Sequence, residues 1–228
     1  MRFRAGPREP EIWRPETGRI EQAPYTADSL RTRVHLSMTE HDAFFVVFRR
    51  GVEKESRVLP AVTRTTLATV AGPWRVAFAP NLGAPPSIVM PELASWTASA
   101  DSGVRFFSGT ATYTHTVRVP ASWRGRRIVL SLGDVRDMAE VTVNGVKMPL
   151  LWKAPFETDV TGALRPGANQ IEVRVTNEWT NRIIGDRAMP GRTVLSQGGP
   201  PPFGARPQMP SPSGLLGPVQ FIAIDDAR

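Results

Sequence analysis

Alternating hydrophobic and polar positions dominate the second half of the chain and predict short β-strands. In the segment 109–119 every second residue is a threonine or another polar residue, while Ala111, Tyr113 and Val117 lie on the opposite face. A period of two is typical of a strand with two different faces. The candidate strands of this region are 74–78, 87–90, 109–119, 127–132, 139–143, 170–176 and 219–224. Their spacing favours a β-sandwich or jelly roll.

Turn residues divide these strands and predict one hairpin in particular. Asn144 and Gly145 stand between two β-type segments, and both residue types tolerate a positive φ angle. We therefore expect a tight two-residue turn at this point.

The first fifty residues carry three further strand candidates, at 11–13, 32–37 and 43–50. In the third, Phe44 and Phe48 lie on one face and Phe45 on the other, so the strand needs cover on both sides. Three strands cannot supply that cover. We expect them to complete a larger β domain or to pack against the rest of the chain.

These patterns predict an all-β chain with three regions. Residues 1–58 form a partial β-sandwich, 59–71 a linker, and 72–228 a jelly roll. Within the last region, 177–217 has little periodicity and is rich in proline, which predicts a long loop.

Composition narrows the class of protein further. The 22 prolines and 19 glycines among 228 residues exclude an all-α bundle. No stretch is apolar enough to predict a membrane span, and the first residues lack the apolar core of a signal peptide. The chain has no cysteine, which excludes disulfides and thiolate metal sites but leaves the compartment open. We expect no membrane partner.

The net charge of +7 raises the question of a nucleic-acid partner. Of the 28 basic residues 25 are arginine, and they are scattered among 21 acids. A nucleic-acid footprint concentrates its basic residues with stacking aromatics on one stripe. The pattern favours an arginine-rich solvated surface instead.

Two loop segments have the residue types that bind sugars, namely an aromatic plate for the C–H face of a pyranose and polar groups for its hydroxyls. The alternative is that the tryptophans pack in a core or interface while the polar residues satisfy loop backbone. The candidate carbohydrate-binding residues are Trp152, Lys153, Asn177, Trp179, Asn181, Arg182 and Asp186.

Other candidates favour structural roles. Trp74, Trp96 and Trp123 are flanked by strand or turn signals and predict core positions. The three histidines lack ligand spacing. Asp101 precedes a strand at a place where a structural calcium ion or an ordinary Asx turn would fit.

An independent enzyme is the alternative interpretation. Glycoside hydrolysis needs two carboxyl groups across a cleft, and Glu178 and Asp186 are candidates for such a pair. No serine hydrolase elbow, Walker A loop or dinucleotide fingerprint is present. The absence of any motif favours a noncatalytic chain.

Four phrases in order, RFFSGTATYTHTVRVP, LGDVRDMAEVTVNG, LWKAPFETDVTGALRPGANQIEVRVTNEWTNRIIGD and SGLLGPVQ, carry a family resemblance. The region resembles the C-terminal part of bacterial α-L-rhamnosidases of glycoside hydrolase family 106. It is also similar, more loosely, to the sugar-binding jelly roll of family 2 glycosidases. The phrases PEIWRPETGRIEQAPY, TRVHLS and FFVVFRR resemble the β-sandwich strands that precede that jelly roll in the rhamnosidases.

The resemblance implies a galactose-binding-like jelly roll and a role in binding or positioning rhamnose-containing glycans. It also implies that the catalytic carboxylates lie on a barrel that this chain does not match. We therefore expect a noncatalytic C-terminal module of a hydrolase, either from a truncated gene or as a split subunit, with a periplasmic or secreted location. The alternatives are a small stand-alone glycosidase and a structural subunit that docks on a separate barrel. The expected protein partner is such a barrel or a second copy of this chain.

Overall fold

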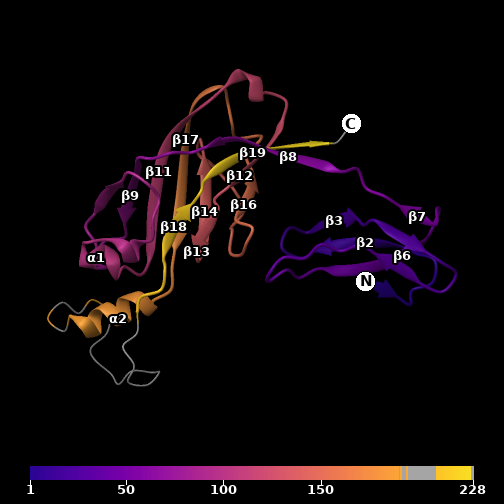
Figure 1. The fold of residues 1–228 in the computed structure, drawn as a ribbon, viewed down its shortest axis with the longest axis horizontal. Coiled ribbons are helices and arrows are strands. Elements are labelled where there is room, and N and C mark those ends of the chain that lie inside the picture. The colour runs from indigo at the N-terminus through magenta and orange to yellow at the C-terminus, as the bar shows by residue number, and fades with distance from the viewer. Residues whose placement is uncertain (190, 192–193, 195–208, 227–228) are drawn as a thin grey trace. The chain divides into compact units, whose positions relative to one another are not determined.

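The structure, a computed structural model, describes residues 1–189, 191, 194 and 209–226 and consists mainly of antiparallel β-sheets (Figure 1). The chain divides into two compact units, residues 1–63 together with Asp226, and residues 64–225. The predicted all-β class is confirmed. In the described residues no helix is both long enough and apolar enough to cross a membrane.

The first unit contains two small antiparallel sheets. One has the strand order β1-β5-β4-β7, and the other has the order β3-β2-β6. The strands are β1 (Arg2–Phe3), β2 (Arg8–Arg14), β3 (Arg19–Gln22), β4 (Tyr25–Ala27), β5 (Thr32–Val34), β6 (Phe45–Gly51) and β7 (Ser56–Arg57).

The core of the first unit is small. Ile12, Ala23 and Val34 are buried, and one face of β6 packs on them through Val46 and Phe48, together with Phe44 just before the strand. The opposite face of β6 is not fully covered, because Phe45 is 63% exposed. The three predicted strands are confirmed, whereas β1, β3, β4 and β7 are too short and polar to show a hydrophobic period.

The second unit holds a six-stranded sheet of order β10-β9-β11-β17-β14-β15, a four-stranded sheet of order β16-β12-β19-β8 and the pair β13-β18. The strands of these sheets are β8 (Val62–Thr69), β9 (Trp74–Phe78), β10 (Ser87–Met90), β11 (Thr110–Val119), β12 (Arg127–Ser131), β13 (Asp134–Arg136), β14 (Met138–Val143), β15 (Val146–Lys147), β16 (Glu157–Asp159), β17 (Gly167–Thr176), β18 (Gly214–Gly217) and β19 (Gln220–Asp226). The helical segments are η1 (Trp96–Ala98), α1 (Ser102–Arg105), η2 (Ala121–Trp123) and α2 (Thr180–Ala188).

The core of the second unit lies on the inward faces of these strands. Trp74 and Trp96 are fully buried, and Trp123 packs on Phe221 with 5.3 Å between ring centroids. The indole N–H of Trp96 donates to the Tyr113 hydroxyl at 2.6 Å. The core positions predicted for Trp74 and Trp96 are therefore confirmed, whereas Trp123 is partly buried and packs against the core.

The predicted hairpin is present between β14 and β15. Asn144 has a φ of 51° and Gly145 a φ of 84°, the left-handed values that a two-residue hairpin turn requires. The Asn144 side chain also donates to the Ala163 carbonyl at 2.8 Å, which ties the turn to a neighbouring loop.

Two segments differ from the sequence-based expectation. The segment 59–71, expected to be a linker, contains β8, which lies beside β19. Its valine and threonine residues favour strand conformation, although they show no clear alternation. The segment 177–217, expected to be one long loop, contains α2 and β18, while 190, 192–193 and 195–208 lie outside the described residues. Helix α2 has no regular apolar stripe, so its sequence shows no helical signal.

Candidate functional site

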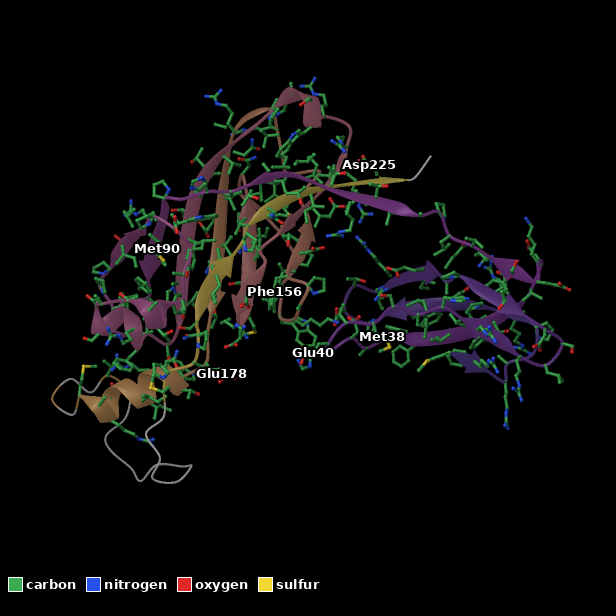
Figure 2. All side chains as sticks on the ribbon, viewed as in Figure 1. Met38, Glu40, Met90, Phe156, Glu178 and Asp225 are labelled. Atoms are coloured by element: carbon green, nitrogen blue, oxygen red, sulfur yellow. The ribbon has the colours of Figure 1, made fainter. Side chains whose placement is uncertain are left out.

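The predicted sugar-binding residues lie around the point where β17 leads into α2. Figure 1 places α2 at one end of the second unit, beyond the ends of β13 and β18. Figure 2 shows Glu178 at this same end, whereas Asp225 lies at the far end of the unit. The residues near Glu178 fall into a buried group and an exposed group.

Asn177 belongs to the buried group and binds backbone. Its Oδ1 accepts the Gly109 N–H at 2.9 Å, and its Nδ2 donates to the Phe107 carbonyl at 2.9 Å. The amide therefore joins the end of β17 to the loop that leads into β11. With both ends of the amide engaged and the residue 9% exposed, it is not positioned to meet a ligand.

Arg182 and Asp186 form a buried ion pair within α2. The Arg182 Nε lies 2.8 Å from the Asp186 Oδ1, and the two side chains are 2% and 0% exposed. The Asp186 Oδ1 also accepts the Val194 N–H at 3.0 Å. Because charges are costly to bury without a partner, this pair offsets part of the cost of burying both groups. Among the described residues the Arg182 Nε and Nη2 have no hydrogen-bond partner of good geometry.

Two glycines provide the space for the Arg182 guanidinium. A Cβ placed on Gly185 would lie 2.6 Å from Nη2, and one placed on Gly83 would lie 2.9 Å from Nη1. The backbone N–H of Arg182 donates to the Ser108 hydroxyl at 3.0 Å. The arginine is thus built into the packing of α2 against the loops around Gly83 and Ser108.

Asn181 fixes the returning chain. Its Nδ2 donates to the Ser211 carbonyl at 2.8 Å, and its Oδ1 accepts the Ser211 N–H, also at 2.8 Å. This two-way amide bond orients the approach to β18. Asn177 and Asn181 therefore bind backbone groups, which is the alternative to sugar binding that the sequence left open.

The two tryptophans form the exposed group. Trp152 is 48% exposed and Trp179 is 53% exposed. The Lys153 ammonium lies 5.6 Å from the centroid of the Trp152 ring, within the range of a cation–π contact. The interpretation of these tryptophans as core residues does not fit this exposure.

The segments that carry the two tryptophans bind to the start of β14 from opposite sides. Leu151 and Ala139 exchange backbone hydrogen bonds of 2.9 and 2.7 Å. Continuing that antiparallel register places Trp152 opposite Met138, which is 40% exposed. On the other side of the same segment, the Asp137 carboxylate accepts the N–H of Glu178, the residue before Trp179, at 3.1 Å. We call Met138, Trp152 and Trp179 the tryptophan edge.

Met138 was not singled out from the sequence. Its outward direction nevertheless agrees with the alternation of β14, because Ala139 and Val141 are buried. The alternation along β14 does not predict that Leu151 pairs with Ala139, because that pairing is a contact with another segment of the chain.

The acidic candidates occupy different environments. Glu178 is exposed, and Asp186 is buried within its ion pair. A glycosidase needs both carboxyl groups accessible to one substrate. Of the two, only Glu178 is accessible in this structure.

Asp101 caps a helix. Its Oδ1 accepts the N–H groups of Gly103 at 2.7 Å and Val104 at 3.1 Å, which stabilises the start of α1. Among the described residues no group of three or more histidines and acids has the geometry to hold a metal ion. The calcium role of Asp101 stays a prediction.

Comparison with known proteins identifies similar chains among glycoside hydrolases. The structure of a rhamnosidase from Novosphingobium sp. PP1Y matches 97% of this chain with 38% identity and a TM-score of 0.81. A putative beta-glucuronidase of Formosa agariphila is 34% identical over 168 residues, 70% of this chain, and a beta-glucuronidase of Paenibacillus borealis is 36% identical over 109 residues, 46% of this chain. No family model matches the sequence.

These similarities cover only a fraction of the other proteins. The chain spans 21% of the rhamnosidase chain, 14% of the Formosa protein and 18% of the Paenibacillus protein. Over nearly the whole of its length, and at 38% identity, the chain is therefore similar to part of a rhamnosidase.

Proposed function

We propose that this chain is a noncatalytic, carbohydrate-associated module of an α-L-rhamnosidase-like glycoside hydrolase. In this proposal the second unit is a galactose-binding-like jelly roll of the kind found in glycoside hydrolase family 106. It binds or positions a rhamnose-containing glycan. The rhamnosidase similarity over 97% of the chain supports the parent class.

The observation that supports the binding role is the exposure of Trp152 and Trp179. An indole face packs well against the C–H face of a sugar ring, and Lys153 beside Trp152 offers a donor for hydroxyl oxygens. The buried residues of the same segment act as the support: Asn177, Asn181 and the Arg182–Asp186 pair hold the backbone that carries Trp179.

Calorimetric titration of the chain with rhamnose-containing oligosaccharides tests this role. We expect weak binding, and a loss of affinity of at least about fivefold in Trp152→Ala and in Trp179→Ala, because each change removes a stacking surface. Val89→Ala is the matched control. Val89 is 67% exposed on β10, a strand of the six-stranded sheet that also contains β14 and β17. No heat with the wild type, or unchanged affinity after Trp179→Ala, would remove the proposed site.

The tryptophan edge also favours a second candidate function, docking on a separate catalytic barrel. Met138 is 40% exposed, and Leu150, two residues before Trp152 in the chain, is 53% exposed. Contiguous exposed apolar side chains are typical of interaction sites. Size-exclusion chromatography with a separately produced barrel would detect the complex. Under this hypothesis Trp179→Ala weakens the complex. Sugar titrations then give no heat with the wild type or with Trp179→Ala.

Independent catalysis has a direct test. If the chain is noncatalytic, the purified protein does not hydrolyse aryl rhamnosides. Turnover that disappears in Glu178→Gln but persists in Glu140→Gln would establish the alternative of a small stand-alone glycosidase and refute the noncatalytic proposal. Glu140 is a suitable control because it is also an exposed acid of this unit.

A further inference from the structure

The outer face of one sheet in the first unit carries a row of arginines. The register of β1 and β5 places Arg2 directly opposite Arg33. Thr32 and Val34 on either side of Arg33 are buried, so the Arg33 side chain lies on the outer face of the sheet. Arg31, also exposed, directly precedes this strand. We call Arg2, Arg31 and Arg33 the arginine trio.

This arrangement is unfavourable by itself. Like charges directly opposite each other on neighbouring strands repel, and such pairs destabilise a sheet. Other arginines of the same unit are paired with acids, at distances of 2.7 to 2.9 Å: Arg14 with Glu21, Arg49 with Glu11, and Arg57 with Glu9. Within the described residues, no ion pair involves a member of the arginine trio.

The trio lines a hollow of about 380 Å³ together with Thr26, Ala27 and Asp28. Asp28 does not offset the charge by a direct ion pair, because its Oδ1 accepts the N–H groups of Leu30 at 2.8 Å and Arg31 at 2.7 Å. These backbone hydrogen bonds, and then the charges of Arg31 and Arg2, lower the pKa of Asp28. Three arginines and one acid therefore line this hollow.

Hydroxyl groups continue the row across the sheet. Thr26 is the register partner of Arg33 on one side and of Ser56 on the other, and both hydroxyl residues are exposed. A surface that combines guanidinium forks with neighbouring hydroxyls matches a ligand that has a carboxylate and several hydroxyl groups.

We propose that the arginine trio and Thr26 form a binding site for the carboxylate of an acidic sugar. The ligand class rests on the proposed function, since it assumes that the chain associates with glycans. The site itself is separate from the tryptophan edge, because it is built from residues of the first unit alone. The bound carboxylate offsets the repulsion between Arg2 and Arg33.

Calorimetric titration of the full chain with sodium glucuronate tests the site, with the ionic strength held constant within each titration. We expect saturable binding that becomes weaker when the titration is repeated at higher salt, since exposed charges are screened. Arg33→Gln should weaken binding at least about fivefold, because it removes the central guanidinium. Arg14→Gln is the matched control: it removes a paired arginine of the same unit and should leave the affinity unchanged.

Folding and ligand class have their own readouts. Arg33→Gln should unfold at an equal or higher urea concentration than the wild type without ligand, because the change relieves repulsion. Acetate should bind more weakly than glucuronate, since it lacks the hydroxyls. Equal binding of glucuronate by Arg33→Gln, equal binding of acetate, or no saturable binding by a folded wild type would overturn the proposal.

Neutral oligosaccharides separate this site from the proposed rhamnose role. They should give the same heat with Arg33→Gln as with the wild type, because their contacts lie on the tryptophan edge. If glucuronate fails while neutral oligosaccharides bind, the acidic-sugar site is wrong and the rhamnose role stands. If glucuronate binding depends on Arg33 while neutral oligosaccharides fail, the site stands and the rhamnose role is wrong.

Discussion

The Arg182 guanidinium and the Asp186 carboxylate, one turn apart on α2, form an ion pair of 2.8 Å that is almost completely shielded from solvent. Both residues have the chemistry of a sugar-binding site, yet the fold uses them internally. Their pairing helps hold the helix that begins after Trp179. The stability of this end of the second unit should therefore depend on the pair.

Asp186→Ala is expected to lower the free energy of unfolding by about 3 to 5 kcal/mol, because it leaves the buried guanidinium without its partner. The matched control is Arg174→Ala. It breaks an ion pair of 2.7 Å with Glu140 in which both side chains are about half exposed, and such a pair contributes about 1 kcal/mol or less. Urea unfolding measures both variants. Equal losses would contradict the structural role of the buried pair.

Asn177→Ala is expected to destabilise the chain by about 1 to 3 kcal/mol, because the Gly109 N–H and the Phe107 carbonyl lose their partner. Gln170→Ala, which removes an exposed amide from β17, the strand that ends just before Asn177, should cost much less. Urea unfolding gives the comparison. A variant with normal stability but lost glycan binding would instead make Asn177 a ligand contact.

Tyr113 is expected to give the chain a stability that falls in alkali. Burial raises the pKa of this phenol well above its usual value. As the pH rises, Tyr113 therefore loses its phenolic proton in the unfolded state before it does so in the folded state. The free energy of unfolding is unaffected by this group below about pH 10 and declines above it. Measuring urea unfolding from about pH 8 to about pH 11 should show this decline.

Tyr113→Phe supplies the corresponding variant. At neutral pH it should lose about 1 to 3 kcal/mol, because the N–H groups of Trp96 and Leu215 lose their acceptor. Its decline in alkali should be smaller than that of the wild type. Some decline should remain, since burial, followed by the charge of Glu9, also raises the pKa of Tyr25. A decline as steep as that of the wild type would rule out Tyr113 as its source.

Asp101→Ala should lower the free energy of unfolding by about 1 kcal/mol through loss of the cap on α1. We expect the same loss in EDTA and in calcium chloride, because Oδ1 is already engaged by two backbone N–H groups. The calcium hypothesis makes a different prediction: calcium would stabilise the wild type and leave Asp101→Ala unaffected.

The sequence by itself determined the all-β class and the positions of the principal strands, down to the turn at Asn144 and Gly145. These features depend on local alternation and local φ preference, which a single chain segment displays. The strand and turn signals that flank Trp74 and Trp96 predicted their core positions, and both side chains are fully buried.

Only the tertiary structure decided which polar residues meet solvent. Asn177 and Asp186 look like ligand contacts in the sequence because an amide or a carboxylate has the same chemistry whether it binds sugar or backbone. Burial, the facing of Arg2 and Arg33 across two strands, and the binding of the Trp152 and Trp179 segments to the two sides of β14 arise from contacts between segments far apart in the chain. Local periodicity does not encode such contacts, so the support and the surface of the candidate site could be separated only in the folded molecule.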